Sequence, residues 1–127
     1  MVFAITTVAF SQQIISPLAE NNFLKVTSYD QLTSFVKQLD ESSNLMKIEI
    51  IGQSAQNRNV FALKFSSSEF GKDKSKIKVL FHAQQHGNEQ SGKEGALLLA
   101  LELLKPENQY LFDKIDFAIV PQMNPDG

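Results

Sequence analysis

The amino-acid sequence predicts a three-layer α/β/α fold, in which helices cover a mostly parallel or mixed central sheet, and it predicts that these 127 residues form an incomplete part of that fold. Helix and strand patterns alternate in the order helix, three strands, helix, strand. The final strand–helix–strand unit implies a right-handed parallel crossover. The last strand is apolar, as in a strand with neighbours on both sides, yet only a turn follows it.

The first helix is predicted over residues 29–40. Ser28 and Gln31 have the spacing of a capping box at its start. Four apolar residues follow at the spacing of one helical face: Leu32, Phe35, Val36 and Leu39. This face is therefore expected to pack on the core. Segment 14–25 is expected to be irregular, and segment 107–113 is expected to be a connection.

Two strands are predicted next, over residues 46–51 and 60–65. The first alternates partly between apolar and polar residues. The second places Phe61, Leu63 and Phe65 on one face, because side chains two residues apart point the same way in a strand. Both strands are therefore expected to contribute one face to the core.

A third strand, over residues 77–83, is nearly all apolar, which is typical of a strand covered on both faces. The helix pattern over residues 92–104 is apolar almost all round, so deep packing is expected. Its two carboxylates, Glu94 and Glu102, are expected to be ordinary helix residues. A last buried strand is predicted over residues 117–120, before an Asn-Pro-Asp-Gly turn.

Composition excludes several classes of function. Twelve Lys and Arg against fourteen Asp and Glu give a formal net charge of -2, so the basic surface of a nucleic-acid-binding protein is missing. No apolar run reaches the roughly 18 residues of a membrane span. The absence of Cys excludes disulfides, thiolate metal sites and cysteine nucleophiles. Any metal must be held by His, Asp or Glu, and there are only two His.

The N-terminus is similar to the end of a secretory signal peptide. Residues 2–10 are uncharged and mostly apolar, and Ala9 and Ser11 lie at positions -3 and -1 of a cleavage site before Gln12. This pattern predicts a signal-peptide remnant over residues 1–11 and export to the periplasm or the extracellular space. The alternative is a short N-terminal strand in a cytosolic protein.

The best candidates for chemistry are His86 and Glu89, in the loop between the third strand and the second helix. Ligands of open α/β sheets bind outside the carboxyl ends of strands. Side chains three residues apart converge at the start of a helix, and Gly87 would let the backbone turn sharply between them. Imidazole and carboxylate are ligands that zinc accepts. The alternative is a plain helix N-terminus, capped by Asn88 and with a favourably placed Glu89.

The segment His86-Gly87-Asn88-Glu89 resembles the first zinc-ligand motif of the zinc carboxypeptidase family. Asn57 and Asn59 depart from the family pattern, in which a Gly stands at the place of Asn57, before the residue that corresponds to Arg58. The resemblance covers about residues 28–127 and runs in order through four segments: residues 51–66, 86–89, 92–94 and 121–127.

The resemblance implies roles for individual residues. His86 and Glu89 would be ligands of one zinc ion. Asn88 stands where digestive members carry a substrate-binding Arg, so it is a candidate substrate-binding residue. Arg58 corresponds to a structural Arg near the site. His82 has no ligand role in the family and is expected in the core or supporting the site.

The resemblance also implies what the chain lacks. The third zinc ligand, the general base and the Arg and Asn groups that bind substrate lie beyond the Asn-Pro-Asp-Gly turn in the family. No catalytic residue is therefore assigned. Residues 12–127 are expected to be the N-terminal part of a catalytic domain and to be inactive alone.

The implied function of the full-length protein is that of a zinc metallocarboxypeptidase, a hydrolase that cleaves the C-terminal bond of peptides or proteins with water activated at zinc. Two alternatives stay open. One is a zinc-dependent N-acyl amino-acid deacylase of the aspartoacylase or succinylglutamate desuccinylase type. The other is a non-catalytic α/β binding module.

Overall fold

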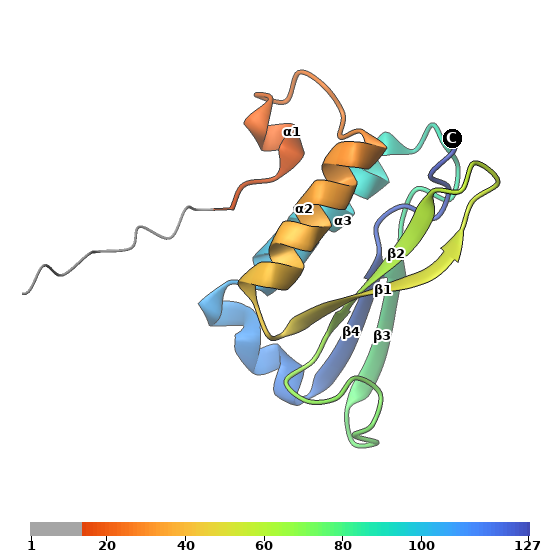
Figure 1. Ribbon diagram of the computed structural model, residues 1–127. Helices are drawn as coiled ribbons and strands as arrows, with labels where there is room; N and C mark the ends of the chain where they lie inside the picture. The colour runs from red at the N-terminus through yellow and green to blue at the C-terminus, as the bar shows by residue number, and fades with distance from the viewer. Residues whose placement is uncertain (1–13) are drawn as a thin grey trace, which may run out of the picture.

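The structure is a computed structural model that describes residues 14–127 (Figure 1). The predicted signal-peptide remnant, residues 1–11, lies outside the described residues. The elements are α1 (Pro17–Glu20), α2 (Tyr29–Ser42), β1 (Met46–Gln53), β2 (Asn59–Phe65), β3 (Ile77–His82), α3 (Gln90–Leu103), the 3-10 helix η1 (Pro106–Asp113) and β4 (Ile115–Val120). No helix among residues 14–127 has the length and apolar character needed to cross a bilayer.

The four strands form one mixed sheet in the order β1-β2-β4-β3. β1 pairs with β2, and β2 with β4, in antiparallel orientation. β3 and β4 are parallel, with register from Ile77 opposite Ile115 to His82 opposite Val120. β3 and β4 precede and follow α3 in the chain, so their parallel pairing confirms that the predicted crossover is parallel. β4 has a neighbour on each side, as its apolar sequence predicts.

Helix α2 begins as its sequence predicts. The Gln31 backbone N–H donates to Ser28 Oγ at 3.3 Å, and the Ser28 N–H donates to Gln31 Oε1 at 2.9 Å, which completes the capping box. The four predicted core residues of this helix are all buried, and the helix continues two residues further than expected, to Ser42.

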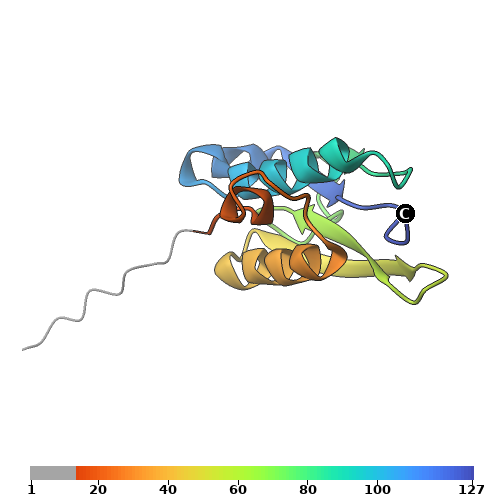
Figure 2. The same cartoon turned by 90° about the horizontal axis from the view of Figure 1, so that it is seen from above.

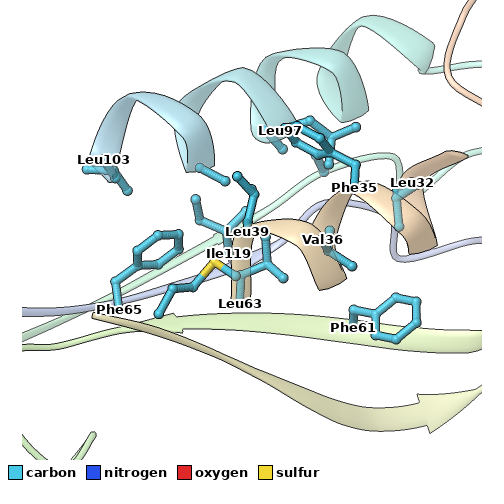
Figure 3. Close-up of a cluster of buried hydrophobic side chains, with 14 of the residues drawn as sticks. Leu32, Phe35, Val36, Leu39, Phe61, Leu63, Phe65, Leu97, Leu103 and Ile119 are labelled. Carbon is cyan, nitrogen blue, oxygen red and sulfur yellow. The ribbon is translucent and has the colours of Figure 1, made fainter. Parts of the chain in front are cut away.

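Helices α2 and α3 pack on the same face of the sheet, α2 beside β1 and α3 beside β4 (Figures 1 and 2). Their buried side chains share one core with the inward faces of β1, β2 and β4 (Figure 3). Phe112 of η1 completes this core and stacks on Phe65 with ring centroids 5.7 Å apart. Segment 107–113, expected to be a connection, is thus part of η1 and holds a buried aromatic ring. Segment 14–25, expected to be irregular, contains the short helix α1.

The prediction that β3 is covered on both faces is wrong for the described residues. Ile77 is 64% exposed and Leu80 is 68% exposed. The physical reason is that β3 is an edge strand, paired with β4 on one side only, and that both long helices pack on one face. The described residues thus form a sheet layer and one helix layer, and the predicted α/β class with a mixed sheet is confirmed.

A buried carboxylate lies near the start of β4. Asp116 is fully buried and accepts hydrogen bonds from Lys78 Nζ at 2.6 Å, Ser66 Oγ at 2.7 Å and the Gly71 N–H at 2.7 Å. Burial alone would raise the pKa of this carboxyl group, but the three hydrogen bonds outweigh it and lower the pKa to about 2. Asp116 therefore holds the loop between β2 and β3 against the sheet.

Candidate metal-binding loop

The loop that carries the candidate ligands lies at the carboxyl end of the parallel strands. β3 ends at His82 and α3 begins at Gln90. The Ala83 N–H donates to Val120 O at 2.9 Å, which extends the pairing of β3 with β4 by one residue. Because ligands of open α/β sheets bind at this edge, the loop has the position predicted for a functional site.

His86 and Glu89 face one another across this loop. Nδ1 of His86 lies 2.9 Å from Oε1 of Glu89, and the His86 backbone N–H donates to Glu89 Oε2 at 3.1 Å. Both side chains are open to solvent, with exposed fractions of 70% and 51%. The hydrogen bond to the His86 side chain, followed by that to its backbone, lowers the pKa of Glu89. The predicted convergence of the two side chains is confirmed.

This donor set fits part of a zinc site. An imidazole nitrogen and an ionised carboxylate, adjacent and accessible, are donors that zinc takes. Residues 14–127 contain no group of three or more His, Cys, Asp and Glu side chains placed to hold a metal ion. The loop therefore offers two donors where catalytic zinc sites use three protein ligands.

Asn88 and His82 do not have all the roles expected of them. Glu89 is the residue at the N-cap of α3, where it makes no side-chain capping bond, so the alternative in which Asn88 caps this helix is wrong. Asn88 is exposed between the two candidate ligands. His82 is exposed as well, so of its two expected places, in the core or supporting the site, the core is wrong. The reason is that it ends the edge strand β3.

Arg58, expected to be structural, holds the turn that follows β4. Its Nη1 donates to Pro125 O at 2.7 Å, and its guanidinium carbon lies 5.6 Å from the centroid of the Tyr29 ring. Asp126 accepts from Ser54 Oγ at 2.7 Å. These bonds join the turn between β1 and β2 to the turn after β4. The Asn124 N–H donates to Gln84 O at 3.0 Å, so the candidate metal-binding loop lies at the same end of the sheet.

Gly87 is required for close packing. A Cβ atom at this position would collide with the backbone of Gly127. The predicted turn between His86 and Glu89 is present, since the Glu89 N–H donates to His86 O at 3.1 Å. Gly87 is not among the residues with positive φ, so this turn does not itself require glycine. The contact between the candidate metal-binding loop, residues 83–89, and the turn after β4 is what excludes a side chain here.

Sequence reasoning missed a buried polar cluster at the start of α3. Glu94, expected to be an ordinary helix carboxylate, is 7% exposed and accepts from the N–H and Oγ1 of Thr27 at 2.6 and 2.7 Å. Lys93 is 3% exposed, and its ammonium donates to Thr27 O. Burial lowers the pKa of Lys93, although Glu94 opposes this shift. The sequence signal that could have revealed this cluster is the pair of adjacent charged residues, Lys93 and Glu94, at the start of an apolar helix.

Sequence and structure comparisons agree on one family. The family described as zinc carboxypeptidase matches residues 32–127. Carboxypeptidase D of Mus musculus is 31% identical over 106 residues, which cover 79% of this chain and 8% of that protein. The catalytic chain of human carboxypeptidase N is 30% identical over 106 residues, covering 78% of this chain and 23% of that protein.

Solved structures have the same arrangement of elements. The crystal structure of carboxypeptidase A from Helicoverpa armigera superposes with a TM-score of 0.69 and 26% sequence identity. The match covers 81% of this chain and 25% of that structure. This chain thus spans about a quarter or less of the length of each of these relatives.

Proposed function

This chain belongs to the zinc carboxypeptidase family, and from that membership we propose that the protein it forms is a zinc-dependent metallocarboxypeptidase. Such a hydrolase removes the C-terminal residue of a peptide or protein substrate. The observation that carries the proposal is the pair His86 and Glu89, whose nitrogen and oxygen donors lie 2.9 Å apart at the carboxyl end of the parallel strands.

In this proposal His86 and Glu89 hold one zinc ion. The lowered pKa of Glu89 keeps its carboxylate ionised and available to a cation. His86 offers a ring nitrogen from an exposed imidazole. Bound zinc would polarise the scissile carbonyl group and lower the pKa of water. The third ligand and the general base are proposed to come from outside residues 14–127.

Asn88 is proposed to contact the substrate. It is exposed and lies between the two ligands in the chain. Its amide can donate to a peptide carbonyl and accept from a peptide N–H. A change of Asn88 should therefore alter substrate binding more than zinc content.

The zinc content of the full-length protein tests the ligand assignment. His86→Ala and Glu89→Ala should each lower the zinc stoichiometry, whereas Gln85→Ala, at an exposed neighbour, should retain it. Equal zinc in all three variants would remove the basis for the assignment.

Substrate panels test the reaction class. Release of C-terminal amino acids from peptides supports a carboxypeptidase. Cleavage of N-acyl amino acids alone would favour the deacylase, for which the comparisons give no support. Zinc binding without turnover of either panel would favour a non-catalytic binding module.

Export belongs to the same proposal. The apolar residues 2–10 and the small Ala9 and Ser11 support a cleavage site before Gln12, with domain 12–127 delivered to the periplasm or the extracellular space. N-terminal sequencing of the protein from its native host tests this. A mature chain that begins at Gln12 is expected, and an uncleaved Met1 in the cytosol would contradict it.

A further inference from the structure

The backbone carbonyl of Gly87 accepts two hydrogen bonds from side-chain amides. Nε2 of Gln84 donates to it at 3.0 Å, and Nε2 of Gln90 donates to it at 2.8 Å. Gln84 precedes the candidate ligands in the chain, and Gln90 follows them. One carbonyl inside the metal-binding loop is therefore held from both ends of that loop.

Lys93 determines which way the Gln90 amide points. Its Nζ donates to Oε1 of Gln90 at 2.7 Å. An ammonium group has only donors, so the oxygen of the amide must face Lys93 and the NH2 group must face Gly87. Lys93 is itself anchored by its hydrogen bond to the carbonyl of Thr27, and Glu94 Oε1 lies 3.9 Å from its Nζ.

Gln84 is held by the turn after β4. The Asn124 N–H donates to Gln84 O at 3.0 Å, and the Gln84 side chain is 2% exposed. Its φ of 46° lies in the left-handed region, and its Oε1 has no partner among the described residues. Both features are unfavourable, and strained residues of this kind persist where surrounding contacts over-determine them. The hydrogen bond that the Gln84 side chain makes in this unfavourable conformation is the one to the Gly87 carbonyl.

We propose that Gln84 and Gln90, with Gln90 oriented by Lys93, form an amide clamp on the Gly87 carbonyl that positions His86 and Glu89 for zinc. The proposal rests on the zinc-binding role proposed for that pair. The two amides act through the backbone between the ligands, so they are positioning residues. Groups that orient metal ligands commonly change metal affinity when they are altered.

Gln90→Met in the full-length protein tests the clamp. Methionine has nearly the same length but cannot donate to Gly87, and Gln85→Met is the matched control at an exposed neighbour whose side chain makes no hydrogen bond within residues 14–127. Zinc affinity is measured by competition with a chelator, and the visible spectrum of the Co2+ form reports ligand geometry. The expected result is zinc affinity about tenfold weaker than in the control, with an altered Co2+ spectrum.

Gln90→Glu is the second variant. A carboxylate at the first residue of α3 is favourable for the helix and, by charge alone, would strengthen cation binding. Weaker zinc binding in this variant would therefore run against the effect of charge and would report the changed contact at the Gly87 carbonyl, where a donor is replaced by an acceptor. Folding of the metal-free protein is expected to be retained.

Each outcome decides the question. Zinc affinity equal to that of Gln85→Met in both variants overturns the clamp, as does weaker binding with an unchanged Co2+ spectrum, because the ligand geometry would then be intact. If His86→Ala lowers zinc binding while the Gln90 variants do not, only the clamp fails. If His86→Ala leaves zinc binding unchanged, the proposed ligands themselves fail.

Discussion

The hydroxyl group of Ser54 donates a 2.7 Å hydrogen bond to Oδ1 of Asp126, although 72 residues separate the two in the chain. The backbone N–H of Gln56 donates to Oδ2 of the same carboxylate at 3.1 Å. Nη1 of Arg58 lies 3.7 Å from Oδ1. One carboxylate thus joins the β1–β2 turn to the turn after β4, beside the candidate metal-binding loop.

Asp126→Ala should lower the free energy of unfolding by about 1–2 kcal/mol, because it leaves Ser54 and the Gln56 N–H without their acceptor. Urea denaturation of the purified protein measures the change. Asp113→Ala is the control, since Asp113 is exposed and should change stability by less than about 0.5 kcal/mol. Equal effects of the two changes would mean that the bonds of Asp126 contribute nothing measurable.

Glu94→Ala should be far more destabilising than Glu102→Ala, although both residues lie on α3. Loss of Glu94 removes both bonds to Thr27 and leaves Lys93 buried without its carboxylate, at a cost of about 3 kcal/mol or more. The ion pair of Glu102 with Lys105 is on the surface and is worth under about 1 kcal/mol. Thermal or urea unfolding compares the two, and similar losses would contradict the buried role of Glu94.

The stabilising effect of Asp116 should depend on pH in a definite direction. Its pKa falls from 3.8 to about 2 in the folded protein, so its stabilisation is fully present above about pH 4 and is lost as the pH falls through about 2. The size of this pH-linked part is about 2 kcal/mol.

Unfolding measured from pH 6 down to pH 2 compares the native protein with Asp116→Asn. The advantage of the native protein should shrink across the acid part of this range, because the variant lacks the ionisable group. A difference that stays constant with pH would show that ionisation of Asp116 does not contribute to stability.

Gly87→Ala should weaken zinc binding, because the added Cβ would meet the backbone of Gly127 and displace the metal-binding loop. Gly95→Ala is the matched control. It lies within α3 with open space around its Cβ position, so the change should stabilise the helix by up to about 1 kcal/mol. Chelator competition measures the zinc affinity of both variants, and urea unfolding measures their stability. Native zinc affinity in Gly87→Ala would mean that the contact with Gly127 does not position the loop.

Much of the fold was predictable from local sequence. The capping box of Ser28 and Gln31 marked the start of α2, and the alternation of Phe61, Leu63 and Phe65 marked the buried face of β2. These signals work because a cap and a strand face depend on neighbours in the chain. The exposure of β3 was not predictable, because an apolar strand has the same sequence pattern whether or not other elements cover it.

The candidate site, too, was predictable from the sequence only in part. The facing of His86 and Glu89 followed from their three-residue spacing at a helix start. The amides of Gln84 and Gln90 gave no signal, because a Gln in a loop or at the start of a helix is an ordinary surface residue until its partner is known. The burial of Glu94 was missed because its partner, Thr27, is 67 residues away in the chain.

By itself the sequence determined the two long helices, the four strands, the parallel crossover and the closeness of His86 to Glu89, because periodicity, caps and short spacings act between residues close in the chain. Only the tertiary structure decided which strand stays exposed, why Gly87 bears no side chain, and how Arg58 and Asp126 join two distant turns. These features depend on which surfaces meet after the chain has folded, and no local pattern encodes the identity of a distant neighbour.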